Sequence, residues 1–158
     1  MTHGQKRWVR RAGWILFLIY LVLLVYFLFF AEEYGRQGTG TGEYRYNLVP
    51  FEEIRRFWIY RQQVGFSAAF LNLAGNVIGF MPFGFLLPVM AARMRHFRVT
   101  VPLGFLLSLS VEVIQLFTRV GSFDVDDLML NTLGVVLGYL LFILLNGIRR
   151  MLDHGKKI

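Results

Sequence analysis

The chain has 158 residues, of which 56% are hydrophobic and only 17% are charged. A soluble domain is about half apolar and a quarter charged, so this composition favours a protein whose surface is covered largely by lipid. The net charge of +7 comes from short basic clusters beside apolar stretches, which argues against nucleic-acid binding. The chain contains no cysteine, which excludes disulfides, thiolate metal sites and cysteine nucleophiles.

Four apolar segments are long enough to cross a bilayer, which takes about 20 mostly apolar residues. They cover residues 14–31, 66–92, 99–118 and 128–145. The first carries no charge, whereas the second is interrupted by Asn72, Asn76 and two prolines, and the third contains Glu112. We therefore expect one all-α, polytopic membrane domain built as a bundle of four transmembrane helices.

The charges between these segments predict the orientation of the bundle. Residues 1–13 carry a charge of +4, and residues 93–98 and the C-terminal tail each carry +3. The loop 32–65 is neutral overall, and residues 119–127 sum to −2. Because short loops rich in Lys and Arg stay in the cytoplasm, we expect both termini inside and the loop 32–65 outside. The first segment lacks a signal-peptide cleavage pattern and is expected to remain as an anchor.

The outer loop has two parts. Residues 35–42 read GRQGTGTG, the composition of a flexible linker. Residues 51–63 then show helical spacing, with Pro50 before them and two glutamates in the first turn, where a helix N-terminus favours negative charge. Aromatic residues such as Trp58 are typical of a membrane interface. We expect a short interfacial helix, lying on the outer surface or dipping into it.

Polar side chains form three stripes with helical spacing, and all three fall in the outward halves of the expected spans. The first contains Asn72 and Asn76, the second contains Ser108, Glu112 and Gln115 with Arg119 one heptad after Glu112, and the third contains Asp124, Asp127 and Asn131. Residues three or four apart share a helix face, and polar groups inside a membrane normally face the bundle interior or a wet cavity. The stripes predict a polar pocket open to the outside.

Several chemistries fit this pocket. Glu112 and Asp127 could form an acid–base pair, and these two with Asp124 and Asp126 could hold Mg²⁺, which prefers oxygen ligands. Arg119, together with Arg55 or Arg56, could clamp a phosphate or a carboxylate. The three histidines lie at the expected cytoplasmic ends, which argues against a histidine-bound metal or a Ser-His-Asp mechanism at this pocket. No metal or cofactor is assigned from the sequence.

The same residues also have structural interpretations. Asp124 and Asp127 fit a helix N-cap with a supporting carboxylate, the asparagines could be interhelical hydrogen-bonding groups, and Arg119 could neutralise a carboxylate. The pairs Gly75–Gly79 and Gly134–Gly138 have the spacing at which helices approach closely. Pro82 and Gly84 should loosen the second span and leave carbonyl groups that need partners.

Four motifs in order resemble the VanZ-like family of bacterial membrane proteins, over about residues 47–139. They are Asn47-Leu-Val-Pro-Phe51, the stretch from Asn72 to Gly84, Ser110-Val-Glu-Val-Ile-Gln115, and the stretch from Phe123 to Gly134. The resemblance implies an inner-membrane protein related to one that confers low-level teicoplanin resistance. It points to Asn47, Asn76, Glu112, Gln115, Arg119, Asp124, Asp127 and Asn131 as site residues.

Of three functions that fit the sequence, we expect the first and keep the other two as alternatives. The chain could bind an envelope lipid or cell-wall intermediate, or a glycopeptide bound to one, at the outer leaflet. It could be a membrane-embedded enzyme acting on a lipid-linked phosphate or glycan, with Glu112 and Asp127 as catalytic residues. It could also be an ion-coupled transporter that uses the buried carboxylate. In each case Asn47, Asn72, Asn76, Gln115, Arg119, Asp124 and Asn131 are expected to bind the ligand.

Overall fold

The computed structural model describes residues 3–29, 44–64, 66–119 and 121–155. Four long helices make up most of it: α1 (His3–Phe29), α3 (Phe66–Met90), α4 (Phe97–Thr118) and α5 (Val125–Gly155). A shorter helix, α2 (Glu52–Val64), precedes α3, and a 3-10 turn, η2 (Ala92–Arg95), joins α3 to α4. Strand structure in the described residues consists of β1 (Tyr46–Asn47) and β2 (Phe123–Asp124).

Among the described residues, four helices are long and apolar enough to cross a membrane. Their spanning parts are Arg7–Phe29, Leu73–Met90, Phe97–Thr118 and Val125–Leu152. The expected all-α, multi-pass fold is therefore confirmed. The helices α1 and α5 run further than the apolar segments because their basic ends, which lie outside the hydrocarbon, continue as helix. The linker at residues 35–42 lies outside the described residues.

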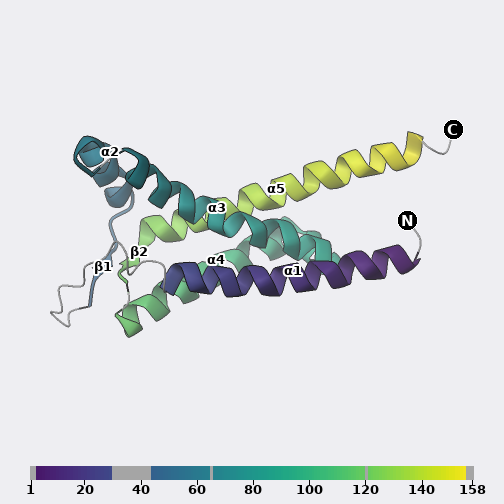
Figure 1. Ribbon diagram of the computed structural model, residues 1–158, viewed down its shortest axis with the longest axis horizontal. Coiled ribbons are helices and arrows are strands. Elements are labelled where there is room, and N and C mark those ends of the chain that lie inside the picture. The colour runs from purple at the N-terminus through teal and green to yellow at the C-terminus, as the bar shows by residue number, and fades with distance from the viewer. Residues whose placement is uncertain (1–2, 30–43, 65, 120, 156–158) are drawn as a thin grey trace.

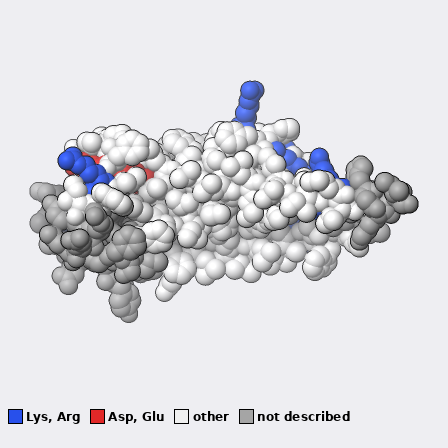
Figure 2. All heavy atoms as spheres, turned by 90° about the horizontal axis from the view of Figure 1, so that it is seen from above, with Lys and Arg blue, Asp and Glu red and all other residues white. Residues whose placement is uncertain are grey.

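Both termini lie at one end of the bundle, and β1, β2 and α2 lie at the other (Figure 1). We call the second of these the loop end, defined by residues 44–64 and 121–124. On the face drawn in Figure 2, Lys and Arg groups are visible toward the termini and again at the loop end, whereas acidic groups are visible only at the loop end. An even number of spans places both termini on the same side of a membrane.

Glycines bring α3 and α5 into direct backbone contact. A Cβ atom on Gly138 would lie 2.0 Å from the carbonyl oxygen of Met81, and one on Gly84 would lie 2.0 Å from that of Val135. Gly134 is equally tight, at 2.2 Å from the carbonyl oxygen of Val77. Only glycine fits at such distances, so the expectation for Gly134 and Gly138 agrees with this packing.

The other predicted glycine pair does not act in this way. A Cβ on Gly75 would meet no atom within 4 Å, and one on Gly79 would make ordinary contact with Leu24 at 3.9 Å. The close contact of α3 with α5 runs along Val77, Met81 and Gly84, a face of α3 that does not include Gly75 or Gly79. The spacing of Gly75 and Gly79 was therefore a wrong guide to helix packing.

Aromatic residues pack α1 against α3. Phe17 and Phe83 are both buried, and their ring centroids lie 5.7 Å apart. The hydroxyl of Tyr20 donates to the carbonyl oxygen of Gly79 at 3.0 Å, one turn before Pro82. Proline has no N–H to give to the preceding turn, and a side chain from a neighbouring helix supplies a donor close to that position. The core is apolar around Phe80 of α3 and Val135 of α5, whose exposed fractions are 1% and 0%.

Candidate functional site

Next to the loop end, three spanning helices and two short strands contribute a layer of buried and half-buried polar side chains. Its core is buried almost completely: Ser108 and Asp126 are 0% exposed, Asn131 is 1% and Glu112 is 2% exposed. Phe80 and Val135 lie on the same helix faces, deeper in the bundle. We call this set of residues the polar layer; its members are Asn47, Asn76, Ser108, Glu112, Gln115, Asp124, Asp126, Asp127 and Asn131.

Glu112 connects α4 to the segment that precedes α5. Its Oε2 atom accepts a hydrogen bond from the backbone N–H of Asp124 at 2.9 Å. The Oδ1 atom of Asp124 in turn accepts from the backbone N–H of Asp126 at 2.8 Å, so Asp124 caps α5 as the sequence suggested. Glu112 is therefore directed into the protein rather than toward lipid, and its carboxylate orients the start of α5.

Asn47 joins this group from a distant part of the sequence. Residues Tyr46 and Asn47 of β1 pair in parallel with Phe123 and Asp124 of β2. The pairing places the side-chain amide of Asn47 at 3.3 and 3.4 Å from the two carboxylate oxygens of Asp124. The Oδ1 atom of Asn47 accepts from the backbone N–H of Val49 at 3.0 Å, which forms the turn that leads to α2.

Asp126 is the residue of the polar layer whose role sequence reasoning missed. Its carboxylate accepts three backbone N–H groups at the start of α2, from Phe51 at 2.5 Å, Glu53 at 2.8 Å and Ile54 at 3.2 Å. A helix N-terminus presents unpaired N–H groups and a partial positive charge, and here the acceptor comes from another helix. Phe51 has a positive φ of 67°, a costly conformation for this residue, and the bond from its N–H stabilises it.

Two asparagines link the spanning helices to one another through hydrogen bonds of their side chains. The side-chain amide of Asn76 on α3 donates to Oδ1 of Asp127 on α5 at 2.5 Å. The side-chain amide of Asn131 on α5 donates to the hydroxyl of Ser108 on α4 at 2.9 Å. Among the described residues, the Oδ1 atom of Asn131 is buried and has no hydrogen-bond donor. A buried acceptor without a donor costs about 1–3 kcal/mol.

The remaining predicted residues lie at the edge of the polar layer or outside it. Gln115 is buried and donates to the carbonyl oxygen of Leu28 at 3.1 Å, which ties α4 to the end of α1. Arg119 ends α4 in the left-handed conformation, and its guanidinium lies 4.9 Å from the centroid of the Tyr44 ring. Asn72 falls in α3, but its side chain lies outside the described part of the chain.

The carboxylates of the polar layer act as acceptors for N–H groups. Asp126 binds α2, Asp124 binds Asp126 and Asn47, and Asp127 binds Asn76. Within the described ranges, no three His, Asp or Glu side chains are grouped closely enough to hold a metal ion. In this arrangement each carboxylate faces a donor from a different element, unlike a magnesium site, one of the chemistries left open by the sequence, in which several carboxylates would face one ion.

Burial raises the pKa of the Asp124 carboxyl above its ordinary value of 3.8, although the hydrogen bonds from Asp126 and Asn47 oppose this. A carboxyl with a raised pKa in the folded protein stabilises the fold below its ordinary pKa. That contribution is lost as the pH rises through the raised value.

We therefore expect the thermal unfolding temperature of the detergent-solubilised protein to decrease as the pH is raised from the ordinary pKa of an aspartate to the raised pKa of Asp124. The Asp124→Asn variant, which cannot ionise, should lack this component. Thermal unfolding of both proteins across the acidic range tests the prediction. Parallel profiles would show that Asp124 titrates alike in the folded and unfolded chains.

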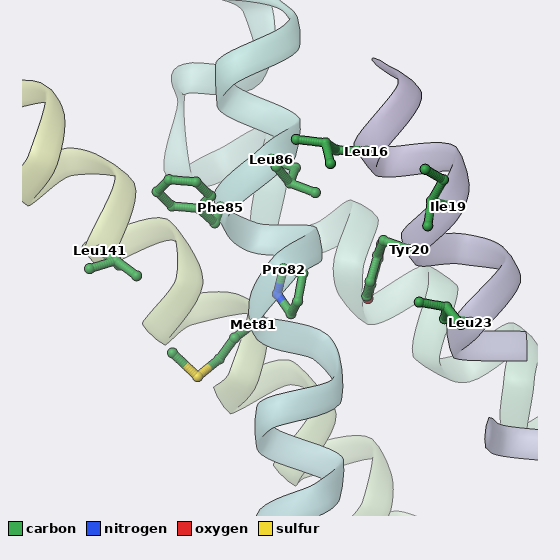
Figure 3. A pocket seen from close by; sticks show the side chains of 9 residues that line it. All are labelled: Leu16, Ile19, Tyr20, Leu23, Met81, Pro82, Phe85, Leu86 and Leu141. Carbon is green, nitrogen blue, oxygen red and sulfur yellow. The ribbon is translucent and has the colours of Figure 1, made fainter. Parts of the chain in front are cut away.

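An apolar groove lies between α1, α3 and α5 (Figure 3). It has a volume of about 490 Å³, and its walls include Leu16 and Leu23 of α1, Met81 and Leu86 of α3, and Leu141 of α5. A surface of this kind between spanning helices suits lipid chains. None of the residues that line the groove belongs to the polar layer, so it is not the polar pocket that the sequence suggested.

Four spanning helices with a buried polar layer at one end define a multi-pass α-helical membrane protein. The model of the VanZ/LLP1 family matches residues 17–146, a range that contains the whole polar layer, and the chain belongs to this family. It is similar to Protein VanZ of Enterococcus faecium, with 31% identity over 132 residues that cover 83% of this chain and 73% of that protein. No solved structure gives a significant match.

Proposed function

We propose that this chain lies in the bacterial cytoplasmic membrane with both termini inside, and that its loop end binds the head group of an envelope lipid or cell-wall intermediate. The orientation is supported by the basic clusters, which belong to the two termini and to the turn between α3 and α4. Lys- and Arg-rich segments of this length remain in the cytoplasm, which places the loop end on the outer side.

The observation that carries the proposal is the carbonyl group of Asn131. It is buried in a layer that is otherwise well paired, and among the described residues nothing donates to it. Buried polar groups in native proteins nearly always have partners. A ligand that supplies a hydroxyl or amide N–H at this position would satisfy the carbonyl oxygen, and the same donors would suit the neighbouring carboxylates.

This chemistry favours a glycan or peptide head group over a bare phosphate. The polar layer is rich in acceptors, whereas two arginines at its edge are engaged elsewhere: Arg119 lies over Tyr44, and Arg56 pairs with Glu53 at 2.5 Å. Sugars and peptides carry the hydroxyl and amide donors that carboxylates and a side-chain carbonyl accept. Cell-wall intermediates attached to lipid present both kinds of group at the outer leaflet.

Binding fits the geometry better than acid–base catalysis. Glu112 already accepts the N–H of Asp124, and Asp127 accepts the amide of Asn76. Carboxylates that accept such bonds are stabilised as acceptors and are oriented by the protein. The resemblance to a teicoplanin-resistance family then suggests that the chain alters the exposure of a cell-wall intermediate to glycopeptides.

We expect purified protein to bind a lipid-linked peptidoglycan precursor in a native mass spectrometry titration, and Asn131→Leu to weaken this binding about tenfold, since a buried carbonyl acceptor is lost. Glu112→Gln and Asp127→Asn should also weaken it. The bound precursor should be recovered unchanged. A covalent product that depends on Glu112 would instead support the enzymatic function.

Ser108→Ala is the matched control for Asn131→Leu. It removes the same Asn131–Ser108 hydrogen bond but keeps the Asn131 carbonyl group. We expect Ser108→Ala to retain most of the affinity. If both variants lose affinity equally, Asn131 acts only in packing and the proposal is wrong.

A further inference from the structure

The outer face of α2 exposes large apolar side chains beside an arginine. Trp58 is 67% exposed and Ile59 is 55% exposed, and Arg55 is exposed one turn before them. Residues three and four apart share a helix face, so the three side chains form one surface. In the turn before α2, Leu48 is also exposed, at 60%. We call Arg55, Trp58 and Ile59 the α2 face.

The position of α2 relative to the membrane limits what can cover this face. Val64 ends α2 and Phe66 begins α3, and the first turn of α2 is hydrogen-bonded to Asp126 in the first turn of α5, whose spanning part begins at Val125. The helix α2 therefore lies at the level of the lipid head groups, which cover several ångströms on each side of the hydrocarbon.

The composition of the α2 face matches that environment. Tryptophan is enriched at the membrane–water boundary, where its ring is partly in lipid and its N–H remains hydrated. Arginine can bind lipid phosphate while its aliphatic chain lies along apolar surface. Charged groups are visible over α2 at the loop end in Figure 2, apart from the basic end of the bundle.

Asp126 fixes which side of α2 is exposed. Its three hydrogen bonds hold the first turn of α2 against α5. Arg56 is drawn to Glu53 by an ion pair of 2.5 Å, which leaves Arg55 as the arginine of the α2 face. The helix is thus held at the membrane boundary in a defined rotation and is not a free amphipathic segment.

We propose that the α2 face lies in the outer phospholipid interface, with Trp58 at the level of the upper acyl chains and Arg55 on the phosphates of anionic lipids. Two observations support this placement. Asp126 holds α2 through three hydrogen bonds, and the α2 face combines exposed Trp58 and Ile59 with Arg55. It goes beyond the proposed head-group binding and does not depend on it. The contact would set the depth of the loop end relative to the lipids that carry its ligand.

The test uses the full chain in phospholipid vesicles. The sequence has 3 tryptophans, Trp8, Trp14 and Trp58, and the first two are on α1, at 72% and 49% exposure. The double variant Trp8→Phe, Trp14→Phe leaves Trp58 as the sole emitter. We expect its fluorescence to be quenched strongly by lipids brominated near the glycerol backbone, weakly by lipids brominated near the chain end, and little by aqueous iodide.

In this double variant, Arg55→Gln should reduce the quenching of Trp58 by lipids brominated near the glycerol backbone in vesicles of phosphatidylglycerol. It should also increase the quenching of Trp58 by iodide. Arg56→Gln is the matched control, because it removes a neighbouring charge that belongs to an internal ion pair, and should leave both quenching profiles unchanged. Strong quenching of Trp58 by iodide with none by either brominated lipid would overturn the proposal. Shielding from all three quenchers would show that protein covers the face, and would overturn it equally.

Discussion

Replacing Asp126 with alanine is expected to release α2 from the bundle. The carboxylate accepts three backbone N–H groups from residues that lie more than 70 positions earlier in the chain. Hydrogen bonds to a charged group contribute about 1.5–3 kcal/mol each, and we expect a combined loss near 3 kcal/mol because water partly replaces the acceptor. The amides of Phe51, Glu53 and Ile54 should then exchange with solvent about 100-fold faster.

Hydrogen exchange measured by mass spectrometry on the solubilised protein checks this prediction. Glu52→Gln is the matched control, because Glu52 also lies in the first turn of α2 but is exposed. It should change exchange only slightly, since a charge near a helix N-terminus contributes about 0.3–1 kcal/mol. Unchanged protection of α2 in Asp126→Ala would mean that other contacts hold the helix.

The second large effect is expected from Gly138→Ala. The added Cβ would lie 2.0 Å from the carbonyl oxygen of Met81, and a backbone atom cannot move aside as a side chain can. The helices α3 and α5 would have to separate. Overpacking of this kind lowers the free energy of unfolding by about 1–3 kcal/mol. Because the contact is between two backbones, we expect a loss at or above the upper end of that range.

Thermal unfolding in detergent, followed by the loss of monodisperse protein, measures this effect. Gly75→Ala is the matched control, since its Cβ would meet nothing within 4 Å. Alanine is also the better helix former, by about 1 kcal/mol, so Gly75→Ala should be neutral or slightly stabilising. A Gly138→Ala protein as stable as the parent would show that the two helices are further apart than described.

The sequence was sufficient for the four spans because each is a long apolar run, and the thickness of a bilayer demands that length. The helical stripes were sufficient to place Glu112 and Asn131 on inward faces, since a polar group in a membrane is expensive unless it faces the interior. The periodicity of a helix thus predicts which face is buried. It does not predict which donor each buried acceptor will meet.

The role of Asp126 and the pairing of β1 with β2 could not be predicted in this way. Each strand has only two residues, too few for an alternating pattern, and parallel pairing depends on where the spanning helices place distant segments. Asp126 is one position away from the inward stripe of Asp127 and Asn131, so helical spacing assigned it elsewhere. Gly75 shows the opposite error, because its spacing fits a packing motif but it lies on a face of α3 where a Cβ would meet no atom within 4 Å.

A density map of the purified protein with a lipid-linked peptidoglycan precursor most directly tests whether the polar layer receives a ligand. We expect head-group density at the loop end, with a donor within hydrogen-bonding distance of the Oδ1 atom of Asn131. A map in which the precursor lies elsewhere, and in which protein groups alone surround that oxygen, would contradict it.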